Sequence, residues 1–227
     1  MDGVHIEFAE IDCMTQEPPR PPVRTTYRHG DLRRALLDAG IELARAGGPD
    51  AIVLREVTRR AGVVPNAAYR HFEGRQDLLQ GVRAAALAAL ARAMETELDA
   101  IDPTWPEDAR ARASLRAIGV GYLRFAQMET GLFRTAFAVP DAVENDADPA
   151  KAGDSGLNPF QLLGLALDRL TAAGILPAER RPGAEYLAWS AVHGLALLII
   201  DGPLRGRPPE QTGAIALRVV EMVENGL

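Results

Sequence analysis

The chain has 227 residues, of which 47% are hydrophobic and 25% charged, and its formal net charge is −6. This composition is that of an ordinary soluble globular protein with one large or two modest domains. The single cysteine excludes an intrachain disulfide, and the longest uncharged apolar run, Tyr186 to Ile200, is shorter than the roughly 20 residues that span a bilayer.

The charge is unevenly distributed along the chain. Residues 20–80 carry 11 Arg against 7 acidic residues, whereas residues 1–19 carry 5 acidic residues and no basic one. The rest of the chain is acidic as well. Because nucleic acid responds to the local charge of a surface, a modestly basic segment on an acidic chain does not exclude DNA as a partner.

Residues 1–26 contain the proline cluster PPRPPVR and no periodic apolar pattern, so we expect a disordered tail. The opening residues are acidic and lack both a basic segment and a long apolar run, which argues against a signal peptide. Cys13, in this tail, fits a reducing compartment, and we expect a cytoplasmic protein. Met14 is an alternative start of the chain.

The next segment predicts three helices. The first runs from about Gly30 to Ala46, because apolar residues recur there on one helical face. The stretch from Leu54 to Phe72 predicts two short helices, with Gly62 ending one and Pro65 in the first turn of the other. A helix of about seven residues, Pro65 to His71, is not stable alone, so its neighbours must hold it. This is the arrangement of a helix-turn-helix, whose second helix enters the major groove of DNA.

The remainder predicts further helices and no strand, so the fold class is all-α with about nine helices. The predicted helices of this part are Arg75 to Ile101, Pro106 to Glu129, Leu132 to Ala138, Pro159 to Ala173, Pro182 to Asp201 and Pro208 to Asn225. Between the third and fourth of them, Val139 to Leu157 is acidic and aperiodic. A loop of this length inside a compact domain is often functional or disordered.

The runs YRHGDLRRALLDAGIELARAGG (Tyr27 to Gly48) and LREVTRRAGVVPNAAYRHFEGRQDLL (Leu54 to Leu79) resemble the N-terminal domain of TetR/AcrR-type transcriptional regulators. A second, weaker resemblance lies in WSAVHG, which contains Trp189, His193 and Gly194 and is similar to the W-x-x-x-H-G signature of one C-terminal subclass. The resemblance implies an all-α homodimeric repressor. Its parts would be a tail (residues 1–26), a helix-turn-helix DNA-binding domain (27–74) and a ligand-binding and dimerisation domain (75–227).

By the same resemblance, seven residues match positions that contact DNA in the family: Arg55, Asn66, Ala67, Tyr69, Arg70, His71 and Arg75. The chemistry of these residues supports the match. Arg70 can pair with guanine and Asn66 with adenine, whereas Tyr69 and Arg75 would contact phosphate and fix position. For each residue alone, the alternative is an ordinary solvated surface residue.

The sequence departs from the family pattern before both short helices. Val53 and Val64 stand where a Ser or Thr commonly caps the helix, and Ala67 replaces a frequent Thr. A missing cap costs about 1 kcal/mol. These departures leave the fold expectation intact but make a relative's operator a poor guide.

The body offers candidates for a ligand cavity, namely Tyr122, Phe125, Met128, Phe133, Phe137, Phe160, Trp189 and His193. The alternative is that these residues form plain core, and for His193 that it is a satisfied core histidine. None of the four histidines has a neighbour at metal-site spacing, so we expect no metal, no cofactor and no catalytic residue.

The last two predicted helices carry more apolar surface than packing within one chain needs. We expect them to form the homodimer interface as an intersubunit four-helix bundle. Its candidate residues are Ala188, Ala191, Gly194, Leu195, Leu198, Ile215, Val219 and Met222.

Two functions follow from these patterns. The first is a ligand-responsive repressor that binds a pseudo-palindromic DNA operator as a homodimer and is released by a small, largely apolar effector. The second is an all-α small-molecule-binding protein or enzyme with a vestigial helix-turn-helix. No nucleophile elbow, phosphate loop or paired-carboxylate motif supports chemistry, and we expect no membrane partner.

Overall fold

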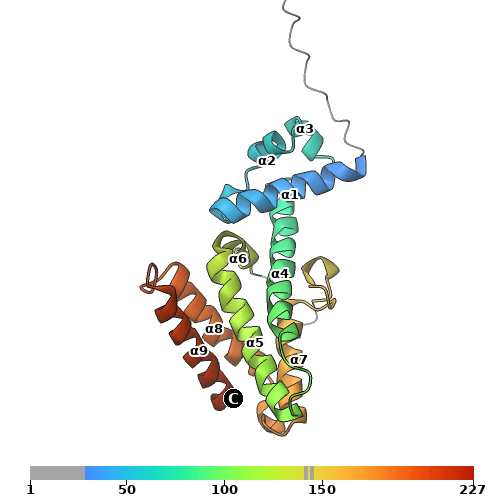
Figure 1. The fold of residues 1–227 in the computed structure, drawn as a ribbon. Helices are drawn as coiled ribbons and strands as arrows, with labels where there is room; N and C mark the ends of the chain where they lie inside the picture. Colours follow the sequence, from blue (N-terminus) through green and yellow to red (C-terminus); the bar gives the residue numbers. More distant parts are fainter. Residues whose placement is uncertain (1–28, 141–142, 144–145) are drawn as a thin grey trace, which may run out of the picture.

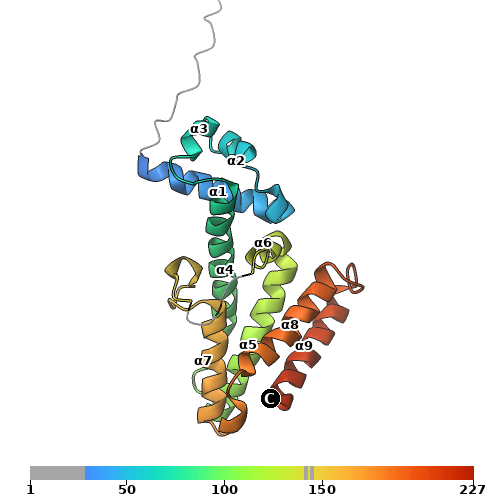
Figure 2. The same ribbon diagram turned by 180° about the vertical axis from the view of Figure 1, so that it is seen from behind.

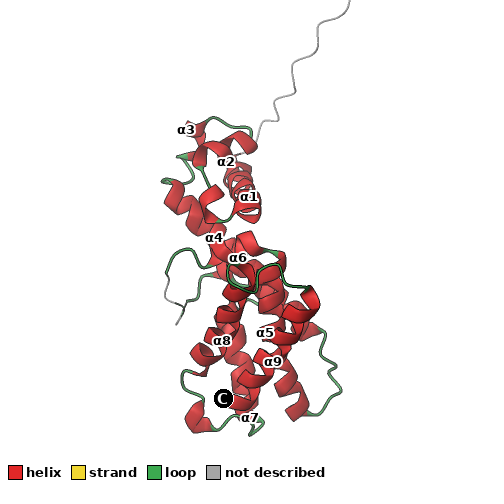
Figure 3. Cartoon of the chain, turned by 90° about the vertical axis from the view of Figure 1, so that its left-hand side faces the viewer, coloured by secondary structure: helices red, strands yellow, loops and turns green. Residues whose placement is uncertain are grey.

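The computed structural model describes residues 29–140, 143 and 146–227 of the chain. Within these ranges every regular element is helical, as the all-α prediction required (Figure 3). The predicted tail, residues 1–26 with Cys13, lies outside the described residues. None of the helices that the described residues form combines the length and the hydropathy of a membrane-spanning helix.

The N-terminal head consists of three α-helices and one short 3-10 turn (Figure 1). α1 spans His29–Gly47, η1 Pro49–Ala51, α2 Leu54–Arg60 and α3 Pro65–Ala68. The side chains of Leu36, Val57 and Phe72 are almost fully buried between these elements. α1 lies across the top of the molecule and carries α2 and α3 on its outer side, so the two short helices are the part most distant from the body.

The body contains the other six α-helices and two short 3-10 turns. α4 spans Arg75–Asp99, α5 Glu107–Met128, α6 Thr130–Ala136, η2 Pro149–Lys151, α7 Pro159–Ala172, η3 Ala178–Arg180, α8 Ala184–Ile200 and α9 Pro209–Gly226. α4 begins under α1 and runs down the body beside α5, so a single helix joins the two regions (Figures 1 and 2). α8 and α9 pack side by side against α5 and form one flank of the body.

The expected helices are all present, and three segments differ from expectation. α3 ends at Ala68 instead of His71, because the following turn tightens: the N–H groups of His71 and Phe72 both donate to the carbonyl of Ala68, at 2.9 and 3.0 Å. This tightening accompanies the insertion of the Phe72 ring into the core. α6 begins and ends two residues before its predicted bounds.

The third difference concerns the expected aperiodic loop. The part of this loop from residue 146 to 157 contains η2 and is held to α4 by the carboxylate of Glu95. That carboxylate accepts hydrogen bonds from the backbone N–H groups of Asp154 (2.8 Å) and Ser155 (3.0 Å) and from the Ser155 hydroxyl (2.5 Å). A Cβ atom at Gly153 would overlap this carboxylate, so a larger residue there would require the Glu95 side chain to move.

Candidate nucleic-acid interface and ligand cavity

The turn between α2 and α3 is a Schellman motif. The N–H of Val63 donates to the carbonyl of Thr58 at 3.0 Å, and that of Gly62 donates to Arg59 at 3.2 Å. Gly62 has φ 70°, as its predicted role requires. The motif satisfies carbonyl groups at the end of α2 and fixes the direction in which α3 starts.

The cations on α2 are not equivalent. Arg59 and Arg60 both hydrogen bond to Glu56, and Arg60 also lies 3.5 Å from Glu42. The hydrogen bond from Arg59, with help from Arg60, outweighs desolvation and lowers the pKa of Glu56 to about 2. Arg55, by contrast, is exposed and makes no side-chain hydrogen bond or ion pair within the described chain.

α3 and the turn after it gather most of the predicted DNA-contacting residues. Asn66, Tyr69 and Arg70 are exposed, whereas Ala67 and His71 are half-buried. Like Arg55, Arg70 has no ion-pair partner among the described residues, so two arginines of this surface are available to an outside anion. Neither Val53 nor Val64 makes a side-chain capping bond, as their sequence predicted.

Arg75 has a structural role that its sequence position did not reveal. Its guanidinium donates from Nε to the carbonyl of Ile52 (2.8 Å) and from a terminal nitrogen to that of Pro49 (2.9 Å). These bonds tie the first residue of α4 to η1 and the segment after it. Contact of Arg75 with phosphate stays a prediction. A phosphate would have to bind the guanidinium where these two carbonyl groups hold it.

The body contains a cavity of about 510 Å³, lined by residues of α4, α5, α7, α8 and α9 and of the loop before α7. Five of the eight predicted ligand-binding residues line it: Tyr122, Phe137, Phe160, Trp189 and His193. They come from four different segments, and their rings contact one another with centroid separations of 4.9 to 6.3 Å.

A hydrogen-bonded chain runs through three of these rings. The indole N–H of Trp189 donates to the hydroxyl oxygen of Tyr122 at 3.0 Å, and that hydroxyl lies 2.7 Å from Nδ1 of His193. Burial raises the pKa of the Tyr122 hydroxyl above its ordinary value and lowers the pKa of His193. Both groups are therefore neutral near pH 7. The i, i+4 spacing of Trp189 and His193 places both on the face of α8 that meets Tyr122.

Three predicted ligand-binding residues do not line the cavity. Met128, in the last position of α5, is 78% exposed and lies at the surface. Phe125 is buried in the core, and Phe133 is buried behind the wall, where its ring packs edge-on against Tyr122 at 5.4 Å. Phe125 and Phe133 therefore belong to the hydrophobic core, which was the alternative to a ligand-binding role.

The cavity also contains polar residues that the sequence analysis missed. Arg83 on α4 is buried and donates from Nε to the carbonyl of Ala136 at 3.0 Å. Lys151 and Asp146 form an ion pair of 2.6 Å in the loop. Arg83 gives no signal in the sequence, because its position on α4 resembles any solvated arginine. The aperiodic loop was a usable signal for the ion pair, since loops of that length are often functional.

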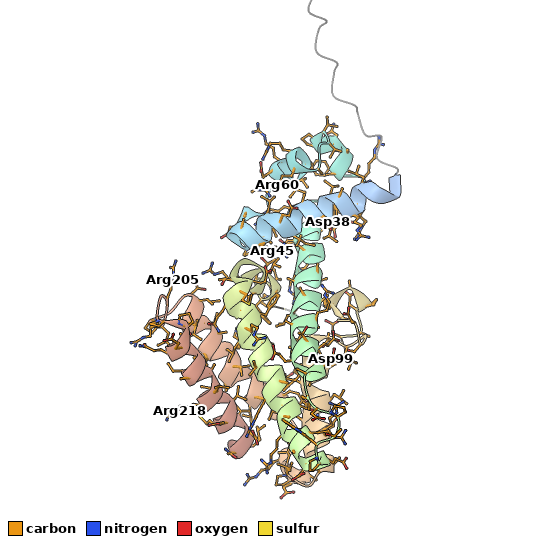
Figure 4. The ribbon with its side chains drawn as sticks, viewed as in Figure 1. Asp38, Arg45, Arg60, Asp99, Arg205 and Arg218 are labelled. Atoms are coloured by element: carbon orange, nitrogen blue, oxygen red, sulfur yellow. The ribbon has the colours of Figure 1, made fainter. Side chains whose placement is uncertain are left out.

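The outer face of α8 and α9 is apolar and uncovered. Gly194, Leu198 and Met222 are exposed there, together with Leu187, Leu197 and Leu217, whereas Ala191, Ile215 and Val219 are half-buried. Arg218 projects from the side of α9 that faces away from α5 (Figure 4). Ala188 and Leu195 are buried in the stripe of α8 that packs on the chain's own core, and this burial removes them from the expected interface.

Two family models match the chain. Residues 36–82 match the model of bacterial regulatory proteins of the tetR family, and residues 115–223 match a tetracyclin repressor-like C-terminal domain. The chain belongs to the TetR family of bacterial transcriptional regulators.

The chain is similar to individual proteins at different levels of sequence identity. The regulator SrpR of Pseudomonas putida is 34% identical over 61 residues, which are 27% of this chain and 29% of SrpR. A protein of unknown function from Rhodococcus sp. RHA1 is 25% identical with a TM-score of 0.69, covering 90% of this chain and 99% of that one. A TetR family regulator from Marinobacter aquaeolei VT8 shares the fold, with 16% identity, a TM-score of 0.58 and coverage of 86% and 95%. The chain spans less than half the length of the curated relatives it matches.

The candidate DNA contacts and the cavity residues fall in different TetR matches. The match to the N-terminal model runs from α1 into α4 and contains every candidate DNA contact, from Arg55 to Arg75. The match to the C-terminal model runs from α5 into α9 and contains the aromatic cavity residues. Membership of the W-x-x-x-H-G subclass of the TetR family stays a prediction.

Proposed function

We propose that this TetR-family protein is a ligand-responsive repressor, which binds a pseudo-palindromic DNA operator as a homodimer and is released by a small, largely apolar molecule. The observation that carries the proposal is the connection of two sites by one helix. Arg55 and Arg70, without partners among the described residues, lie on an exposed helix-turn-helix, and α4 leads from that head to the wall of the cavity.

The outer face of α8 and α9 supports the homodimer. Gly194 lies inside α8, where glycine costs about 1 kcal/mol relative to alanine. A Cβ atom added at Gly194 would meet nothing within 4 Å, so packing within this chain does not require the glycine. A second copy that approaches α8 closely would require it. Around Gly194, the exposed Leu187, Leu197 and Leu198 supply the apolar surface that such an interface buries.

Contacts between head and body support communication between the two sites. Gly131 of α6 packs directly on the last carbonyl groups of α1, and a Cβ atom there would overlap the oxygens of Ala44 and Arg45. α6 in turn accepts the hydrogen bond from Arg83 in the cavity wall. A ligand that favours another position of α4 or α6 would therefore change the placement of the head. Such a ligand acts only through its different affinities for the two arrangements.

A mobility-shift titration with the DNA upstream of the protein's own gene tests the proposal. We expect a sequence-specific shift that weakens steeply with salt, because arginine contacts to phosphate release counterions. A scrambled fragment of the same length and composition is the control. A shift that is equal for both fragments, or absent at low salt, would favour the competing small-molecule-binding protein with a vestigial helix-turn-helix.

A further inference from the structure

The direction of the hydrogen bonds around Tyr122 determines what the cavity offers to a ligand. Trp189 can only donate, so the Tyr122 oxygen accepts that bond. Tyr122 is 4% exposed, and His193 Nδ1 is the one acceptor that its own O–H reaches within the described chain. The hydroxyl therefore donates to Nδ1, and the single proton of the neutral His193 ring is on Nε2.

This arrangement leaves the Nε2–H of His193 as a donor in the cavity wall. His193 lines the cavity, and no oxygen of the described residues accepts a hydrogen bond from its Nε2–H. A cavity ligand with an acceptor oxygen would complete the chain that starts at Trp189. A pure hydrocarbon would leave the donor without a partner, which costs affinity.

The rest of the wall favours a ligand with flat rings. Aromatic side chains from α5, α7, α8 and the segment after α6 surround the space. Phe160 lies 5.7 Å from Tyr186 and 6.3 Å from Trp189, and Phe137 lies 6.0 Å from Trp189 between ring centroids. Tilted and edge-on ring contacts of this kind extend readily to an aromatic ligand.

The charged residues of the wall are engaged with protein partners. Lys151 is paired with Asp146 at 2.6 Å, and Arg83 donates to the carbonyl of Ala136 at 3.0 Å. An ionised ligand would have to displace one of these partners inside a largely apolar space. An uncharged ligand leaves them in place.

We infer that the effector of the proposed regulator is an uncharged aromatic molecule with an acceptor oxygen, such as a ketone carbonyl, which accepts a hydrogen bond from Nε2–H of His193. This inference rests on the proposed function, because it assumes that the cavity ligand changes DNA binding. Binding of the ligand in the cavity can nevertheless be measured without DNA. The Trp189–Tyr122 pair then acts as a positioning element, because it fixes which nitrogen of His193 carries the proton.

Isothermal calorimetry with benzophenone and diphenylmethane tests the inference, since these probes have the same two rings and differ in a carbonyl against a methylene. Wild-type protein should bind benzophenone about tenfold more tightly, the value of one net hydrogen bond. In His193→Phe this preference should fall to about one while diphenylmethane binding persists. In Tyr122→Phe the preference should fall to an intermediate value, because the proton on Nε2 is no longer fixed. Trp105→Phe, at an exposed aromatic residue that does not line the cavity, should keep the wild-type preference.

Photolysis of bound benzophenone adds a readout that does not depend on affinity. Covalent labelling should map to peptides of α5, α7 and α8 that contain cavity residues. Equal binding of the two probes, absence of binding by both, a preference that survives in His193→Phe, or labelling outside the cavity would each overturn the inference. All these measurements use protein free of DNA, so they can fail while sequence-specific DNA binding succeeds, and the reverse.

Discussion

The head presents polar side chains on its surface, whereas the body surrounds an internal cavity. The head buries a few apolar side chains and leaves arginine, asparagine and tyrosine exposed on neighbouring turns of the chain. The body buries its aromatic and polar groups around an internal space, with partners such as Tyr122 and His193 separated by 71 residues. A surface for a large partner can therefore be recognised in a short segment of sequence, whereas a cavity for a small molecule exists only after folding.

Substitution of Arg70 distinguishes the proposed DNA-binding surface from the general charge of the protein. Arg70→Ala should weaken binding to the upstream DNA by about 1–3 kcal/mol per half-site, because it removes the guanidinium that we propose contacts a base. Fluorescence anisotropy at fixed salt measures it. Arg110→Ala, at an exposed arginine in the first turn of α5, is the control and should leave affinity unchanged. Equal losses in the two variants would remove α3 from the interface.

The next effect concerns the junction between the two regions. Gly131→Ala should destabilise the protein by about 1–3 kcal/mol, because the added methyl meets backbone carbonyls of α1 that cannot move aside. Urea unfolding measures it. Gly213→Ala, inside α9 with open space at Cβ, is the matched control and should stabilise by up to about 1 kcal/mol. If both variants gained stability, the contact between α6 and α1 would be looser than described.

The hydrogen bonds between Glu95 and the loop residues Asp154 and Ser155 should depend on pH, unlike the exposed charges of the head. Burial opposes ionisation of Glu95, but the hydrogen bonds from Ser155 and Asp154 outweigh it and lower the pKa of this carboxyl. The pKa of Glu95 in the folded protein is thus below its unfolded value of roughly 4.3. The ionised carboxylate therefore contributes to the free energy of unfolding above that pH, and this contribution is lost as the pH falls through the folded pKa.

Glu95→Gln should therefore cost about 1–3 kcal/mol of unfolding free energy at pH 7, and the difference from wild type should shrink as the pH falls below roughly 4.3. Urea unfolding across this pH range measures both values. Glu179→Gln, an exposed residue of η3, should show no such difference at any pH. A cost for Glu95→Gln that stays constant with pH would mean that the carboxylate charge is not what holds the loop.

A substitution before α3 should stabilise the head and leave the contacts of the body unchanged. Val64→Ser should stabilise the protein by about 1 kcal/mol, because the hydroxyl can cap an open N–H of α3. For a chain of this size the melting temperature should rise by about 2–4 °C. Val64→Ala, which shortens the side chain without adding an acceptor, is the control. An equal rise in both variants would show that loss of the exposed valine, not capping, causes it.

The sequence predicted the head well because its signals are local. Gly62 and Pro65 determine the turn through their own backbone preferences, and the structure follows both. The shortening of α3 was not predictable in the same way, since it depends on where the ring of Phe72 is buried.

The body was predicted only in part, for a related reason. Helical spacing located α5 and α8, but spacing alone does not tell which buried aromatic residue faces a space and which faces core. Phe133 and Phe137 belong to the same short segment, yet one is behind the wall and the other lines the cavity. The bond between Glu95 and Ser155 joins residues far apart in the chain, and no sequence pattern announces it.

In the proposed function, the body controls the binding of the head to DNA. The most direct measurement is fluorescence anisotropy of the upstream DNA, titrated with wild-type protein in the absence and presence of saturating benzophenone. We predict salt-sensitive, sequence-specific binding that weakens at least about fivefold when the cavity is occupied. Affinities that are equal for upstream and scrambled DNA, with and without benzophenone, would contradict the account.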